Sequence, residues 1–170
     1  MIHGSMPRPK DMNTDPFDTE AWRVERNEKL IDWMAGNTDA VAFLLDLSQI
    51  VEVWDDLIDK DAQPTESEIH AAFQAALINF PLNPFYRAHQ DRLLPLVIVC
   101  VNAWLDSVSM EQGSDPHERM WAFFLKDFGR EIFIFCAMLT GGWMHMRKVS
   151  MDMRRFFTHE TYETWEHRHG

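Results

Sequence analysis

The spacing of large apolar residues is the feature that most constrains the fold of this chain. In one stretch they are separated by four, three, four and three positions: Phe43, Leu47, Ile50, Trp54 and Leu57. This spacing places their side chains on one face of an α-helix. No segment alternates apolar and polar residues for long enough to predict a strand. The sequence therefore predicts an all-α fold.

Helix start and stop signals divide the chain into segments. A cap at Asp18, a capping box at Thr65 and Glu68, and prolines after Asn83 and Asp115 mark helix starts. The predicted helices span residues 18–34, 38–59, 65–80, 84–89, 92–112, 116–139 and 143–157.

Three sequence signals are expected to end or bend helices. Gly36 is expected to end the first helix, Pro81 to end the third, and the pair Gly141–Gly142 to break or bend the chain before the last. The result is a single-domain bundle of about five to seven helices over residues 18–157. A flexible arm over residues 1–17 precedes it, and a polar tail over residues 158–170, with room for a short surface helix, follows it.

The length and net charge of the chain limit the partners and locations that can be expected for this protein. The 170 residues suit one domain, and 16 basic against 27 acidic residues leave a net charge of −11. Such a surface repels nucleic-acid phosphates and anionic lipids, so neither partner is expected. The longest apolar stretch, residues 93–105, is shorter than a membrane span. No membrane contact is therefore expected. Cys100 and Cys136 lie in apolar runs and are predicted to be buried free thiols, with a single disulfide as the alternative. Free thiols favour a reducing compartment, so a cytoplasmic protein is expected.

Four acidic residues crowd the end of the helix predicted over residues 38–59. At about 100° per residue, Asp55 and Asp59 lie about 40° apart around the helix, with Glu52 just beyond Asp59 and Asp56 farther away. Like charges at this spacing repel, and acids at a helix C-terminus oppose the helix dipole. A divalent cation removes both penalties, so the four acids are predicted ligands for Mg²⁺, or for Mn²⁺ as the alternative. A solvated helix end without metal is the competing interpretation.

A polar stripe on the next long helix is the predicted partner of these acids. Asn102, Asp106 and Ser109 recur at positions i, i+4 and i+7 in a segment that is otherwise apolar. Because this helix is expected to be buried, the stripe must be satisfied by other groups. Asp106 is therefore predicted to face the acids and share their metal, with Asn102 as a further ligand. A hydrogen-bonded network without metal is the alternative.

Further candidate ligands follow in the chain. Asp127 and His145 are candidate metal ligands, and Arg130 is a candidate phosphate contact. The competing interpretations are an ion pair between Asp127 and Arg130, and a packed or capping role for His145. Other candidate cations for a phosphate are Arg87, Arg92, Arg147 and Lys148.

The acidic stretch matches a known motif. Asp55-Asp56-Leu57-Ile58-Asp59 has the form DDxxD and resembles the aspartate-rich helix of class I isoprenoid diphosphate and terpene synthases. The resemblance implies an all-helical cavity in which Asp55 and Asp59 bind Mg²⁺ ions that hold a substrate diphosphate. Asp56 would take a weaker or indirect part.

A second family shares this chemistry. Glu52-x-x-Asp55-Asp56-x-x-Asp59 is similar to the acidic repeats of the MazG and dimeric dUTPase class of all-α nucleotide pyrophosphatases. That resemblance implies helix-borne carboxylates and Mg²⁺ acting on a nucleoside triphosphate.

Both resemblances predict Mg²⁺-dependent binding or turnover of a small molecule that carries a diphosphate, with a metal-activated water if hydrolysis occurs. Whether the protein is an enzyme is left open. The alternative is a non-enzymatic acidic helical interaction protein, such as a phage or bacterial accessory factor that binds a basic protein partner. A homo-oligomer is compatible with either function.

Overall fold

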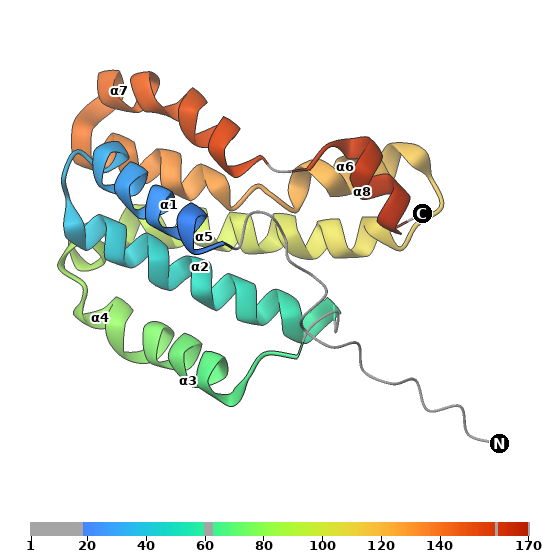
Figure 1. The fold of residues 1–170 in the computed structure, drawn as a ribbon, viewed down its shortest axis with the longest axis horizontal. Helices are drawn as coiled ribbons and strands as arrows, with labels where there is room; N and C mark the ends of the chain where they lie inside the picture. The colour runs from blue at the N-terminus through green and yellow to red at the C-terminus, as the bar shows by residue number, and fades with distance from the viewer. Residues whose placement is uncertain (1–18, 60–62, 159, 170) are drawn as a thin grey trace.

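The computed structural model describes residues 19–59, 63–158 and 160–169, and this part of the chain contains helices but no strand (Figure 1). The predicted all-α fold is thus confirmed. The predicted arm over residues 1–17 and the predicted cap Asp18 lie outside the described residues. The helices are α1 (Glu20–Trp33), α2 (Thr38–Asp59), α3 (Glu66–Gln74), the π-helical segment η2 (Ala75–Asn79), α4 (Phe80–Leu82), α5 (Pro84–Glu111), α6 (Pro116–Leu125), α7 (Arg130–Phe157) and α8 (Tyr162–His169).

Several helix starts follow the predicted local chemistry. The capping box is confirmed, since Glu68 N donates to Thr65 Oγ1 at 3.3 Å and Thr65 N donates to Glu68 Oε2 at 2.6 Å. Asp115 also caps its helix as predicted, because its side chain accepts from the His117 amide. At the start of α1 the structure differs from the prediction: Thr19 is the N-cap.

Asn83 joins two helix starts. Its Oδ1 accepts from Tyr86 N at 2.9 Å and caps α5, as the sequence predicts. Its Nδ2 donates to Asp39 O in the first turn of α2, also at 2.9 Å. The starts of α2 and α5 are therefore fixed to each other by one buried amide.

The helical segment that begins with α3 does not end at Pro81 as predicted. The π-helical turn η2 precedes this proline, with the Phe80 N–H bonded to Ala75 O, and α4 continues to Leu82 before the chain leaves the helix at Asn83. The prediction failed because the wider π-helical turn accommodates the proline, so the helical segment continues past Pro81.

Two other boundaries differ from the prediction. The segments predicted as separate helices over residues 84–89 and 92–112 form the single helix α5, with Pro95 inside it. The helix predicted over residues 116–139 is interrupted by a turn at residues 126–129, which separates α6 from α7. The predicted bend at the glycine pair is confirmed, because Gly142 has φ +79° and ψ 177° inside α7.

The core gathers around α2, which lies between α1 and α7 on one side and α3 on the other (Figure 1). Phe43 is fully buried, and its ring lies against those of Phe80, Phe85 and Tyr86, with centroids 5.0–6.2 Å apart. This aromatic cluster holds the N-terminal half of α2 against the start of α5.

The segment predicted as a polar tail contains α8, and this helix is anchored on α6. Trp165 is 2% exposed, and its ring lies 5.7 Å from that of Phe123. Arg119 Nε of α6 donates to Glu166 Oε1 at 2.9 Å, with the guanidinium over the Trp165 ring. The buried Trp165 ring and the Arg119–Glu166 ion pair therefore dock this helix on α6.

α5 passes the length and composition test for a membrane-crossing helix, although only 22% of its most apolar 18-residue stretch is buried. The apolar stretch of residues 93–105 lies inside α5, which has 28 residues. One such helix is weak evidence for a membrane span.

Candidate functional site

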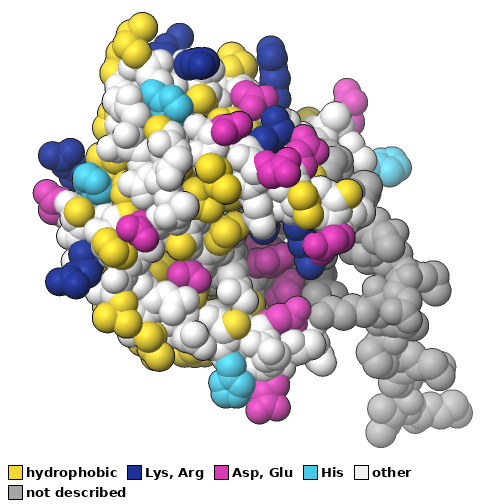
Figure 2. All heavy atoms as spheres, turned by 60° about the vertical axis from the view of Figure 1, so that its left-hand side comes forward, with side chains coloured by type: hydrophobic (Ala, Val, Ile, Leu, Met, Phe, Trp, Pro, Cys, Tyr) yellow, Lys and Arg dark blue, Asp and Glu magenta, His cyan; other side chains and the backbone are white. Residues whose placement is uncertain are grey.

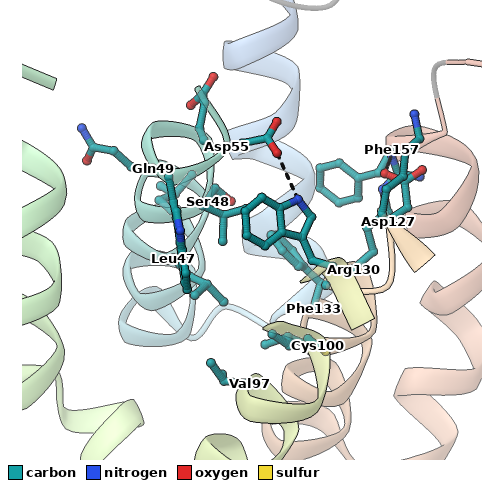
Figure 3. A pocket seen from close by; sticks show the side chains of 18 of the residues that line it. Leu47, Ser48, Gln49, Asp55, Val97, Cys100, Asp127, Arg130, Phe133 and Phe157 are labelled. Carbon is teal, nitrogen blue, oxygen red and sulfur yellow. Dashed lines mark hydrogen bonds and ion pairs between the residues drawn. The ribbon is translucent and has the colours of Figure 1, made fainter. Parts of the chain in front are cut away.

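A cavity of about 770 Å³ lies between α1, α2, α5, the turn before α7 and both ends of α7 (Figure 3). α5 contributes Val97, Cys100, Val101 and Trp104, which recur at i, i+3, i+4 and i+7 and so share one helix face. The other large apolar side chains of the lining are Leu45, Leu47, Val51, Trp54, Trp22, Ile132, Phe133 and Phe157. Most of the wall is therefore aliphatic or aromatic.

Two acids of the predicted cluster reach this cavity. Glu52 and Asp55 lie nearly one helical turn apart on α2, and both line it. Asp55 is half-buried, and its Oδ1 accepts from the indole Nε1 of Trp104 at 3.0 Å (Figure 3). The Trp104 ring also lies 5.4 Å from that of Trp54. The indole thus holds the Asp55 carboxylate toward α5.

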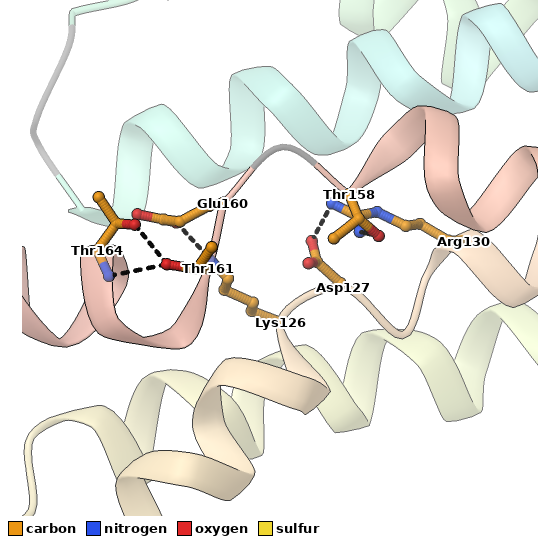
Figure 4. A network of polar contacts seen from close by, with 7 residues as sticks. All are labelled: Lys126, Asp127, Arg130, Thr158, Glu160, Thr161 and Thr164. Atoms are coloured by element: carbon orange, nitrogen blue, oxygen red, sulfur yellow. Dashed lines mark hydrogen bonds and ion pairs between the residues drawn. The ribbon is translucent and has the colours of Figure 1, made fainter.

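Cations line the cavity on its α7 side. Arg130 Nη2 lies 2.7 Å from Asp127 Oδ1, and Arg130 Nη1 donates to Thr158 Oγ1 at 3.4 Å (Figure 4). Burial lowers the pKa of Arg130, and the neighbouring Asp127 carboxylate acts in the opposite direction. The guanidinium nevertheless stays charged at neutral pH.

Lys126 and two arginines of α1 add to this positive charge. Lys126 Nζ lies 2.9 Å from Glu160 Oε2 in the connection between α7 and α8 (Figure 4). Arg23 and Arg26 line the cavity from α1. Four cationic side chains and three carboxylates therefore surround an apolar interior, an arrangement that suits an amphipathic ligand with a charged end.

The fold brings together part of the predicted site. Glu52, Asp55, Asp127 and Arg130 all line the one cavity, although they come from α2 and from the region where α7 begins. The ion-pair interpretation of Asp127 and Arg130 is confirmed.

Asp106 and Asn102 lie elsewhere. Asp106 is two residues from Trp104, and hence about 200° around α5 from the side chain that contacts Asp55. The expected burial of the polar stripe was wrong for both residues, because each is exposed. Asn102 Nδ2 donates to Asp106 Oδ2 at 2.9 Å, so the two side chains satisfy each other on the outer surface of α5.

The remaining predicted ligands are also outside the cavity lining. His145 Nε2 lies 2.8 Å from Trp33 O, where it caps the end of α1, which supports the capping interpretation. Asp56 is half-buried beside Asp55 but does not line the cavity. Asp59 is the last residue of α2, and its side chain lies outside the described part of the chain. Among the described residues, no three side chains of the His, Cys, Asp or Glu type form a group that could hold a metal ion.

Sequence reasoning missed Cys100 and Trp104 as cavity residues. The Cys100 thiol donates to Phe128 O at 3.6 Å, and burial, with a smaller effect from the Glu131 carboxylate, raises its pKa to about 11. The thiol is therefore protonated at neutral pH and is a poor nucleophile. The i, i+3, i+4, i+7 recurrence from Val97 to Trp104 was the available signal for this wall.

No protein-family model matches this chain, and neither a curated protein nor a solved structure matches it.

Proposed function

We propose that this cavity binds a small molecule with an apolar chain and a diphosphate group, together with Mg²⁺. The observation that carries the proposal is the presence of Glu52, Asp55 and Arg130 around one cavity whose other walls are mainly apolar. An apolar chain would fill the interior, and the charged groups would hold the diphosphate.

The apolar wall favours a prenyl chain over a nucleoside. Burying hydrocarbon contributes roughly 25 cal/mol for each Å² removed from water, without the need for hydrogen-bond partners. A nucleobase needs polar groups at its edges, and the uncharged polar side chains of the lining are Ser48 and Gln49. A prenyl diphosphate therefore fits this lining better than a nucleoside triphosphate.

The acid pair suits a metal that arrives with its substrate. Mg²⁺ commonly takes one or two carboxylates and completes its octahedron with waters and substrate phosphate oxygens. Glu52 and Asp55 supply such a pair, and the described side chains form no group of three. We therefore expect Mg²⁺ and the diphosphate to bind cooperatively, with Mn²⁺ able to replace Mg²⁺.

Arg130 would hold the phosphate end. Its planar guanidinium can donate two parallel hydrogen bonds to phosphate oxygens. It is bound to Asp127 at 2.7 Å, so a diphosphate would compete with that carboxylate for the same donors. Bound Mg²⁺ would neutralise the charge of the diphosphate and lower the pKa of a bound water.

Isothermal titration calorimetry of the full chain with geranyl diphosphate tests the proposal. We expect binding that requires Mg²⁺, weaker binding of dUTP, and little heat from Mg²⁺ alone. Asp55→Asn keeps an oxygen for the Trp104 indole but removes the charge, and it should weaken Mg²⁺-dependent binding by about tenfold or more. Asp106→Asn is the matched control, because it removes the same charge outside the cavity and should leave the affinity unchanged.

Two results would overturn the proposal: no binding of any diphosphate in the presence of Mg²⁺, or equal losses in Asp55→Asn and Asp106→Asn. Release of inorganic diphosphate, followed in the same samples, decides between binding and turnover.

The alternative of an acidic protein that captures a basic partner has weaker support. On the face shown in Figure 2, acidic side chains are interspersed with basic and hydrophobic ones. Salt-sensitive capture of a polylysine probe, reduced equally by neutralising Asp55 or Asp106, would favour that alternative.

A further inference from the structure

The outer surface of the α5–α6 hairpin carries large apolar side chains exposed to solvent. Each has between 38% and 64% of its surface exposed, and together they are Leu94, Ile98, Val99 and Leu105 of α5 with Trp121, Phe124 and Phe128 of α6 or the turn after it. Soluble monomers rarely expose large apolar side chains in such number on one surface.

Contacts between α5 and α6 place the two helices side by side. The Cys100 thiol donates to Phe128 O, and Arg119 Nη1 donates to Glu111 O at 3.2 Å, so α6 runs antiparallel along the second half of α5. The α5 residues that face the bundle are buried, namely Leu93, Cys100, Ala103 and Ser107. The exposed apolar residues of α5 lie on the opposite side of the helix from these buried residues, and α6 packs alongside with its own exposed apolar stripe.

We infer that this surface is the interface of a two-fold homodimer, in which α5 of one protomer packs antiparallel against α5 of a second copy. The seven side chains offer roughly 600 Å² of exposed apolar area, close to the ~800 Å² per partner of a standard stable interface. The inference is independent of the function proposed for the cavity.

The polar pair within the surface favours a second copy over other occupants. Asn102 and Asp106 lie among the apolar residues of α5 and bond to each other. A two-fold axis near Asn102 would bring the same pair from both chains together, so that each amide can donate to the partner carboxylate. A single polar position in an apolar helix interface fixes the register of pairing in this way.

A lipid bilayer fits the surface less well. Asp106 would enter a medium that offers its carboxylate no hydrogen-bond donors, and the net charge of −11 repels anionic headgroups. Pairing with a second copy avoids the first penalty, because the partner's Asn102 can donate to the Asp106 carboxylate.

Sedimentation equilibrium of the full chain tests the inference. The wild type should sediment at twice the chain mass of 20.0 kDa. Ile98→Glu should raise the dimer dissociation constant roughly a hundredfold, because antiparallel pairing about Asn102 places position 98 beside the partner's Asp106, where the new carboxylate meets a like charge. The matched control is Met144→Glu on α7, a residue that is 78% exposed, and it should leave the dimer intact. Far-UV circular dichroism checks that both variants are folded.

A crosslink tests the position of the axis. In an Asn102→Cys variant, the two introduced thiols should form a disulfide-linked dimer on mild oxidation, since the native Cys100 and Cys136 are buried. A monomeric wild type at the highest soluble concentration would overturn the inference. So would equal dissociation by Ile98→Glu and Met144→Glu, or absence of the Asn102→Cys crosslink. Flotation of a monomeric wild type with phosphatidylcholine vesicles would assign the surface to lipid instead.

Discussion

The bend of α7 at Gly142 predicts a loss of folding stability in Gly142→Ala, and backbone geometry gives the magnitude of that loss. At φ +79° and ψ 177°, this residue occupies a region that is essentially restricted to glycine. Placing a residue with a Cβ there costs roughly 1–3 kcal/mol of backbone strain. A Cβ built at Gly142 meets no atom within 4 Å, so steric contact with neighbours adds nothing to this cost.

The unfolded state reduces the expected effect of Gly142→Ala. Alanine has fewer unfolded conformations than glycine, which stabilises the folded chain by about 0.4–1 kcal/mol. Subtracting this gain leaves a net loss of about 0–2.6 kcal/mol, centred near 1.3 kcal/mol. For a domain of this size each kcal/mol lowers the melting temperature by roughly 2–4 °C, so the central value corresponds to a decrease of roughly 3–5 °C for Gly142→Ala.

The control for this prediction is Gly129→Ala. Gly129 also has no atom within 4 Å of a built Cβ, but its φ of −55° is ordinary for alanine. Gly129→Ala should leave the melting temperature unchanged or raise it slightly. Thermal unfolding followed by circular dichroism measures both variants against the wild type. Equal melting temperatures for Gly142→Ala and Gly129→Ala would refute the strain argument.

Two further predictions concern α8 and the cavity wall. Trp165→Ala should release α8 from α6 while leaving the bundle folded, so hydrogen exchange should rise in α8 but not in α2; faster exchange in both would contradict a local role. Because burial raises the pKa of Cys100 from 9.0 to about 11, ionisation of this thiol in the unfolded chain should remove about 2 kcal/mol of stability between pH 9 and pH 11. The free energy of unfolding measured in urea should therefore fall less between pH 9 and pH 11 in Cys100→Ala than in the wild type. Equal decreases in the two proteins would count against this burial effect.

Local chemistry made the helix starts predictable from sequence. The Thr65–Glu68 capping box and the Asn83 cap require only residues within one turn of each other, so their pattern can be read directly. Pro81 was misleading because the effect of a proline depends on the surrounding structure. It follows a π turn, and the helical segment continues through it to Leu82.

The part of the candidate site that lies on one helix was also predictable from local sequence. Crowded charge on one helix singled out Glu52 and Asp55 without knowledge of the fold. Which residue faces them depends on how α5 is rotated about its own axis, and a difference of two positions turns a side chain by about 200°. The expected partner Asp106 therefore lies outside, and Trp104 takes its place beside Asp55.

The joint between the starts of α2 and α5 has a mechanical consequence. Asn83 and the rings around Phe43 hold the two helices together at one end, whereas Asp55 lies 12 positions farther along α2, roughly 18 Å at 1.5 Å per residue. A change in the angle between the two helices therefore rotates α2 about the aromatic cluster around Phe43. A small change in the angle between the two helices moves the Asp55 carboxylate much farther than it moves Phe43, so the width of the cavity near Asp55 is the dimension most sensitive to that angle.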